Sequence, residues 1–254
     1  MLYINNPAAK DSDIELFRRR YKKTSLNALS NPGLIRHFEP SLICSPNTES
    51  RSSRFLIDLV LKAAALSQDS TIENIDETKP DAEFFNIYPG EHYRLLKALT
   101  KILSPANVIE IGTSTGMSSK AILQGLDFGQ LITFDLLPWD HFNTHLNESI
   151  FKDNFEQILI DLSIEKNFNT YKPLLDAADY IFIDGPKDSS FEYKFIQLLA
   201  KLQKKKNKLL IFDDIRFVNM IDLWVSIKSP KLDCTSFGHW SGTGLVDISN
   251  GFIL

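Results

Sequence analysis

Three acidic residues stand where two short apolar runs end. Asp184 follows Tyr180–Ile183, and the pair Asp213 and Asp214 follows Leu209–Phe212. Neighbouring strands of a parallel sheet lie about 4.8 Å apart, so loops that leave their carboxyl ends bring these side chains within one coordination sphere. A hard divalent cation relieves the repulsion among three carboxylates, and oxygen ligands favour Mg²⁺, Mn²⁺ or Ca²⁺ over zinc. The alternative is that the acidic pair only caps the next helix.

A lysine, Lys187, follows Asp184 by three residues. A bound cation lowers the pKa of a hydroxyl that it contacts and fixes the hydroxyl oxygen. Beside that cation and partly desolvated, the Lys187 amine would have its pKa lowered from about 10.4, far enough to accept the proton. The pattern therefore favours deprotonation of a hydroxyl nucleophile by Lys187. The alternative is a surface lysine in a polar loop.

A glycine-containing turn follows the strand predicted over Asn107–Ile111. Gly112 and Gly116 let the backbone turn tightly and approach a ligand, and the helix beyond offers unpaired N–H groups. The dinucleotide fingerprint needs a middle glycine where this chain has Ser114, and no Gly-Lys-Ser/Thr follows to form a phosphate loop. The turn therefore predicts a cofactor loop that is neither a dehydrogenase nor an NTPase loop, unless it is an ordinary strand-to-helix turn.

The next predicted strand ends at Asp135. In doubly wound folds a carboxylate at this place lies across the crevice from the glycine loop, where it accepts hydrogen bonds from both ribose hydroxyls. The position predicts a ribose ligand, and the alternative is an aspartate that caps its own turn.

Together these features resemble the class I S-adenosylmethionine-dependent methyltransferases. The order of Asp184-x-x-Lys187 and then Asp213-Asp214 resembles, within that class, the metal-dependent O-methyltransferases of the catechol and caffeoyl-CoA type, over residues 86–248. The resemblance implies metal ligation by Asp184, Asp213 and Asp214, and catalysis by Lys187 with Asp184. The chain departs from the family pattern at Asp214, where asparagine is usual.

The resemblance also assigns the cofactor positions. It implies that the methionine portion of S-adenosylmethionine lies against Glu110, Gly112, Gly116 and Ser118, and the ribose against Asp135. The adenine would lie near Asp161 and Ser163. The methyl acceptor would be a hydroxylated small molecule.

Short strands and longer helices alternate from about residue 81, which is typical of a parallel sheet covered by helices. Over residues 81–254 we expect a doubly wound, mostly parallel α/β sheet of the Rossmann-like methyltransferase kind that ends in an antiparallel hairpin. Over residues 1–80 we expect a helical extension or cap. The expected strands are Asn107–Ile111, Leu131–Phe134, Phe155–Ile160, Tyr180–Ile183, Leu209–Phe212, Cys234–Phe237 and Gly244–Ile248. The expected helices are Asp13–Tyr21, Arg54–Ser67, Gly90–Leu103, Ser118–Leu126, His141–Lys152, Lys172–Asp176, Phe191–Gln203 and Phe217–Ile227.

Composition narrows the class of protein further. The chain has 254 residues and a net charge of −4, so it lacks the positive field that attracts nucleic acid or anionic lipid. Its two cysteines form no CxxC pair, and no apolar run has the length of a membrane span. We expect a cytoplasmic enzyme with no nucleic-acid or membrane partner, which could form a homodimer.

Two other functions remain open from the sequence. One is a metal-independent methyltransferase of a natural-product or sugar substrate, in which the acids serve as bases or caps. The other is a cofactor-binding regulatory protein without turnover. The five histidines include none with a sequence partner that marks a catalytic triad, although His239 and Trp240 could border the substrate.

Overall fold

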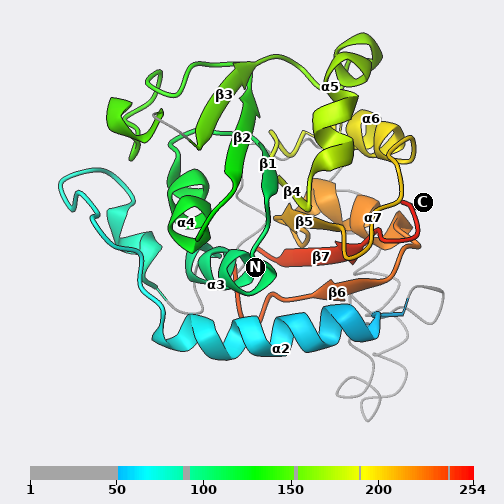
Figure 1. Ribbon diagram of the computed structural model, residues 1–254, viewed down its shortest axis with the longest axis horizontal. Coiled ribbons are helices and arrows are strands. Elements are labelled where there is room, and N and C mark those ends of the chain that lie inside the picture. Colours follow the sequence, from blue (N-terminus) through cyan, green and yellow to red (C-terminus); the bar gives the residue numbers. More distant parts are fainter. Residues whose placement is uncertain (1–50, 88–91, 152–153, 189, 240) are drawn as a thin grey trace, which may run out of the picture.

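The sheet that positions the site has seven strands in the order β3-β2-β1-β4-β5-β7-β6 (Figure 1). The computed structural model describes residues 51–87, 92–151, 154–188, 190–239 and 241–254. β1 to β5 run parallel, and β7 pairs antiparallel with both β5 and β6. The doubly wound, mostly parallel sheet with its antiparallel C-terminal strands is confirmed. The strands are β1 (Asn107–Ile111), β2 (Gln130–Asp135), β3 (Phe155–Leu159), β4 (Tyr180–Ile183), β5 (Leu209–Asp213), β6 (Lys231–Asp233) and β7 (Thr243–Asp247).

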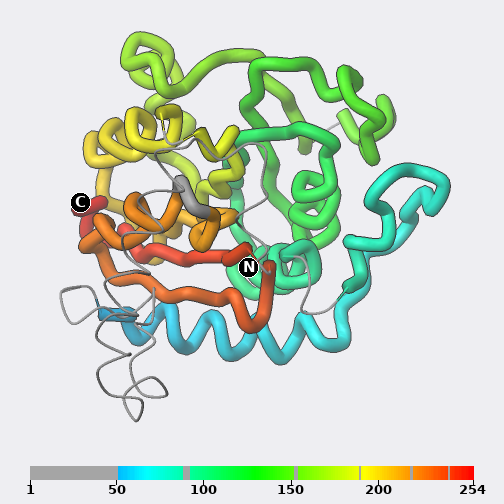
Figure 2. Tube along the Cα trace, turned by 180° about the vertical axis from the view of Figure 1, so that it is seen from behind, coloured from blue at the N-terminus to red at the C-terminus, as the bar shows by residue number. Residues whose placement is uncertain are grey.

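Helices cover both faces of this sheet, which gives three layers (Figures 1 and 2). One face carries α2 (Arg54–Asp69), α3 (Tyr93–Leu103) and α4 (Met117–Gly125). The other carries α5 (Glu165–Ala177), α6 (Ser190–Leu199) and α7 (Val218–Ser226). Two short 3₁₀ helices, η2 (Ala82–Phe85) and η3 (Glu148–Phe151), lie in the connections.

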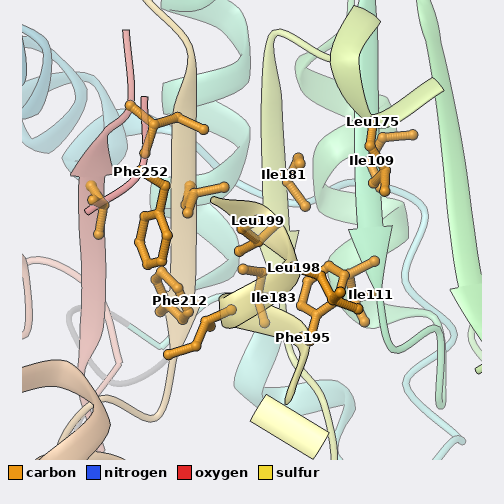
Figure 3. Packing of buried hydrophobic residues seen from close by; sticks show 14 of the residues in the cluster. Ile109, Ile111, Leu175, Ile181, Ile183, Phe195, Leu198, Leu199, Phe212 and Phe252 are labelled. Carbon is orange, nitrogen blue, oxygen red and sulfur yellow. The ribbon is translucent and has the colours of Figure 1, made fainter. Parts of the chain in front are cut away.

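Alternation along the central strands builds two separate cores. In β4, Ile181 and Ile183 pack with α5, α6 and α7 (Figure 3), whereas Tyr180 and Phe182 pack with α2, α3 and α4. Every residue of β4 is therefore apolar and buried, because a parallel strand covered on both faces has no solvent side. Such a strand leaves only its carboxyl end for polar chemistry.

The predicted helix over Arg54–Ser67 is confirmed as α2, which runs to Asp69. Ser53 is its N-cap, where the hydroxyl accepts from the backbone N–H of Leu56, and its apolar side packs in the same core as α3. α2 is thus part of the helical layer on this face of the sheet. The division of the chain at residue 80 stays a prediction, and the helix expected over Asp13–Tyr21 lies outside the described residues.

Three element predictions were wrong. The penultimate strand is Lys231–Asp233 instead of Cys234–Phe237, because Cys234 starts a turn in which its carbonyl accepts from the N–H groups of Phe237 and Gly238. The long helix expected over His141–Lys152 is replaced by η3 and irregular backbone. α5 begins at Glu165 instead of Lys172 and contains Pro173 within its length.

Within the described residues, no helix combines the length and the apolar character that a bilayer span requires.

Candidate active site

The glycine loop, residues 112–116, joins β1 to α4 and touches the neighbouring loop after β4. Gly112 has φ +98°, and a Cβ at this position would lie 2.1 Å from the carbonyl oxygen of Asp184. Its N–H donates to Phe134 O at 2.8 Å, and the N–H of Asp184 donates to Ile111 O at 2.9 Å. Glycine is therefore required here by the backbone conformation and by the close approach of the two strand ends.

Behind the glycine loop, Glu110 is fully buried beneath the start of α4. Its carboxylate accepts hydrogen bonds from the hydroxyls of Ser118, at 2.6 Å, and Ser119. Burial favours the neutral acid more than the two hydroxyls favour the anion, and it raises the pKa of Glu110 to about 7. This geometry gives Glu110 and Ser118 a role in positioning the loop. Gly116, with φ +76°, is the N-cap of the helix.

Asp135 holds the glycine loop from the end of β2. Its Oδ2 accepts from the backbone N–H groups of Thr113 and Ser114 at 2.8 and 2.9 Å. Its Oδ1 accepts from those of Leu136 and Leu137 at 2.6 and 3.1 Å. A carboxylate offers about four lone-pair positions, so these four bonds use them all. A ribose hydroxyl could bind Asp135 only if one of these N–H groups gave way.

Asp161 and Ser163 lie in the loop after β3, next along the same edge. The N–H of Ser163 donates to Asp161 Oδ1 at 2.8 Å, and the Asn167 amide donates to Asp161 O at 2.8 Å. Leu136 follows the end of β2 and is 66% exposed, and Ile164 lies in the loop after β3 and is 50% exposed. Apolar side chains held in water beside an ordered polar loop suit the faces of an aromatic base such as adenine.

The acids predicted to gather at the ends of β4 and β5 do so. One carboxylate oxygen each from Asp184, Asp213 and Asp214 lies within 4.8 Å of the others. We refer to these three residues as the carboxylate cluster. Three oxygen donors at this spacing suit a hard divalent cation, so the donor set fits the metal that the family resemblance implies.

Lys187 points into the carboxylate cluster. Its Nζ contacts Asp184 Oδ1 and lies 3.3 Å from Asp214 Oδ2 and 3.6 Å from Asp213 Oδ2. The backbone here is left-handed, with φ +57°, and the Lys187 N–H donates to the buried Glu192 Oε1 at 2.7 Å. The side chain therefore lies at the cluster as its counter-ion.

The lowering of the Lys187 pKa was predicted beside a bound cation and stays a prediction. Burial alone would lower it, but the carboxylates of Asp184, Asp213 and Asp214 together outweigh burial and raise the pKa above its usual range. The pKa of Lys187 is thus raised by its carboxylate neighbours, and a cation bound among these carboxylates would oppose that effect. Burial and the charge of Asp213 raise the pKa of Asp184, although Lys187 opposes both.

Two histidines that the sequence did not single out as ligands converge on Asp213. His239 Nδ1 lies 2.9 Å and His92 Nδ1 3.2 Å from the same oxygen, Asp213 Oδ1. His92, just before α3, is 2% exposed, and His239 follows the turn that starts at Cys234. Ser241 completes the group, since its hydroxyl lies 2.8 Å from His239 Nδ1 and donates to Asp214 Oδ1. No local motif marks these histidines, because they reach Asp213 through packing of distant segments.

Known proteins match the region that carries these residues. Residues 109–215 match the family model described as a methyltransferase domain. A Dictyostelium discoideum protein named probable caffeoyl-CoA O-methyltransferase 3 is 28% identical over 174 residues, which cover 65% of this chain and 67% of that protein.

The solved structures that are similar to this chain include a methyltransferase of Podospora anserina bound to SAH. It is 16% identical, with 75% of this chain and 87% of that chain covered and a TM-score of 0.45. An O-methyltransferase of Bacillus cereus in complex with SAH is also 16% identical, with 86% and 97% covered and a TM-score of 0.43.

The methyltransferase-domain match over residues 109–215, together with the loops at the strand ends, supports the resemblance to the class I S-adenosylmethionine-dependent methyltransferases. The resemblance to the caffeoyl-CoA O-methyltransferase type is confirmed, and so is the prediction of a methyltransferase enzyme. This finding favours an enzyme over the regulatory protein without turnover.

Proposed function

We propose that the enzyme methylates a hydroxyl group of a small molecule with the help of a divalent cation at the carboxylate cluster. The observation that carries the proposal is the convergence of Asp184, Asp213 and Asp214 with Lys187, directly beside the glycine loop. A caffeoyl-CoA O-methyltransferase bears its acceptor class in its name, and a hydroxylated aromatic acceptor is the corresponding proposal here.

S-adenosylmethionine would supply an electrophilic methyl group on a sulfonium. The glycine loop, held by Asp135 and by Glu110 with Ser118, would bind its methionine portion. Asp135 would bind its ribose in place of one of the four backbone N–H groups. Asp161 and Ser163 would border the adenine, with Leu136 and Ile164 as apolar contacts. Much of the catalysis is then orientation, because both reactants are held at adjacent strand ends.

A divalent cation at the carboxylate cluster would lower the pKa of the acceptor hydroxyl and fix its oxygen. Lys187 Nζ lies within reach of all three carboxylates and would stand beside the acceptor. It can take up a proton there only when its ammonium no longer serves as their counter-ion. The proposed role of Lys187 as base thus depends on competition between two cations for the same oxygens.

The same observation favours a second candidate, a metal-independent methyltransferase. Lys187 already neutralises part of the charge of the carboxylate cluster, and the carboxylates raise its pKa. In that mechanism Asp184 or Asp213 would accept the proton and Lys187 would remain an ammonium that fixes the acceptor.

Chelation separates the two mechanisms. Methyl transfer to a panel of catechols and other phenols should be lost in excess chelator and restored by Mg²⁺, whereas calorimetric binding of S-adenosylmethionine should survive. Lys187→Met keeps the apolar stem and removes the amine, so turnover should fall by about a hundredfold with cofactor affinity nearly unchanged.

Exposed Lys204 offers a matched control, since Lys204→Met should leave turnover unchanged. Full activity in excess chelator would contradict the metal-dependent mechanism. If Lys187→Met were as active as the parent as well, neither role proposed for Lys187 would stand.

A further inference from the structure

The two histidines beside Asp213 form a group distinct from the carboxylate cluster. His92 Nδ1, His239 Nδ1 and Asp213 Oδ1 all lie within 4.8 Å of one another. The imidazole rings face each other nearly edge to face, with centroids 5.2 Å apart. The three donor atoms thus come from the segment before α3, the end of β5 and the loop before β7.

The separations of these atoms suit coordination to one ion. Metal-to-nitrogen and metal-to-oxygen bonds of about 2.0 to 2.2 Å at right angles put neighbouring donor atoms about 3 Å apart. The observed separations from Asp213 Oδ1 are 2.9 Å to His239 and 3.2 Å to His92. The third pair of donor atoms, His92 Nδ1 and His239 Nδ1, lies within 4.8 Å, so all three atoms can face one ion.

His92 gives an independent indication of a missing ligand. Its side chain is buried, yet among the described residues neither of its ring nitrogens has a hydrogen-bond partner of good geometry. A buried imidazole must carry at least one N–H, and leaving buried polar nitrogens unsatisfied costs about 1 to 3 kcal/mol for each group. An ion bound at Nδ1 would satisfy the nitrogen that faces Asp213.

The two oxygens of Asp213 face different groups. Oδ1 faces the histidines, and Oδ2 lies 3.6 Å from Lys187 Nζ, on the side of the carboxylate cluster. Lys187 supplies a positive charge on the side of Oδ2. Asp213 can therefore bridge the two groups, as carboxylates do in sites that hold two adjacent ions.

We propose that His92, His239 and Asp213 form a second metal site, the nitrogen site, which takes a first-row transition-metal dication beside the carboxylate cluster. Two imidazoles and one carboxylate prefer such ions to Mg²⁺, in the order Mn²⁺ < Fe²⁺ < Co²⁺ < Ni²⁺ < Cu²⁺ > Zn²⁺. Three protein ligands leave positions open for an acceptor oxygen. Only this last role rests on the proposed function; occupancy of the site does not.

The test measures metal binding without cofactor or acceptor. Cu²⁺ added to the full-length protein at one equivalent should give pulsed electron paramagnetic resonance signals from the nitrogens of two coordinated imidazoles. His239→Asn and His92→Asn should each reduce the signal to that of one imidazole. Each variant should also lower the affinity for Zn²⁺, measured by calorimetry, by about tenfold or more.

Two control variants sharpen the experiment. His141 is exposed and lies outside the nitrogen site, so His141→Asn should keep both imidazole couplings. Asp184→Asn alters the carboxylate cluster alone and should also keep them. If His92→Asn does not fold, judged by circular dichroism, His239→Asn decides the question.

The proposal is overturned if the parent shows no imidazole coupling, or if the couplings persist in both histidine variants. In either case His92 and His239 serve only to contact the buried Asp213. If the parent shows both imidazole couplings but transfers no methyl group to the phenol panel, the proposed function fails and the nitrogen site stands. Failure of the site and failure of the function are therefore distinguishable.

Discussion

At the carboxyl ends of β1 and β2 the polar groups are joined by backbone hydrogen bonds, whereas at the ends of β4 and β5 they are joined by side-chain charges. Asp135 accepts four backbone N–H groups and thereby fixes the glycine loop. Asp213 instead faces Lys187 on one side and two imidazoles on the other. The first half has a fixed geometry, because four backbone N–H groups hold the Asp135 carboxylate in place.

The second half can change its partners. A cation that binds the carboxylate cluster displaces an ammonium from the same oxygens, so the positions of Lys187 and of the ion are coupled. The difference suits a two-substrate enzyme, in which the methyl donor needs a fixed site and the acceptor oxygen needs a charge that can be rearranged.

The strongest test of the comparison is at Gly112, where the two halves touch. Gly112→Ala should destabilise the fold by about 4 kcal/mol, since it adds a left-handed strain of about 1 to 2 kcal/mol to a Cβ placed 2.1 Å from Asp184 O. Denaturant unfolding measures the change.

Gly251 supplies the matched control for Gly112. Its φ of +97° is nearly the same, but its nearest neighbour to a new Cβ is a lysine side-chain carbon at 3.6 Å. Gly251→Ala should therefore cost only the strain, about 1 to 2 kcal/mol. Equal losses in the two variants would mean that the contact between the halves contributes nothing.

Glu110 gives the half that contains the glycine loop its own pH dependence. Its pKa is about 7 in the folded chain, against 4.5 for the ordinary side chain. A carboxyl that holds its proton more firmly when folded stabilises the fold most at acid pH, and the contribution is lost as pH rises from about 4.5 through 7.

Glu110→Gln removes this ionisation and keeps the shape. The free energy of unfolding of the parent should fall between pH 5 and pH 8 by roughly 2 to 3 kcal/mol more than that of the Glu110→Gln variant. Urea titrations at both pH values measure the difference. Parallel curves for parent and variant would show that the buried acid does not titrate in this range.

The fold could be predicted from the sequence because each strand is marked by a local apolar pattern. Apolar runs such as Tyr180–Ile183, each with a polar residue at its end, define both the strand and the edge where chemistry lies. The convergence of Asp184 with Asp213 follows from the spacing of adjacent strands. The partial charge balance by Lys187 does not, because it depends on the left-handed turn that sends the side chain back into the carboxylate cluster.

The errors arose where tertiary contacts override local pattern. His145 lies in the segment predicted as a helix, but its N–H donates to Thr115 O at 2.8 Å, which ties this backbone to the glycine loop. His92 and His239 were missed as ligands because helix packing and a turn bring them to Asp213. A single sequence carries no periodicity for such a meeting.

The last test concerns Asp135, which was predicted to bind the ribose and which also holds the glycine loop through backbone N–H groups. Asp135→Asn replaces one acceptor oxygen by an NH₂ group that faces backbone donors. Cofactor affinity should fall by about tenfold to thirtyfold, or about 1 to 2 kcal/mol, as measured by calorimetry with S-adenosylmethionine.

Asp179, at the opposite end of the sheet, is the matched control for that change. Its Oδ2 accepts from the consecutive N–H groups of Ala106 and Asn107 at 2.8 and 2.9 Å, just as Asp135 Oδ2 accepts from Thr113 and Ser114. Asp179→Asn should lower the free energy of unfolding about as much as Asp135→Asn does, but it should leave cofactor affinity unchanged. If both variants bind the cofactor like the parent, the backbone bonds of Asp135 do not shape the cofactor site, and the contrast between the two halves is lost.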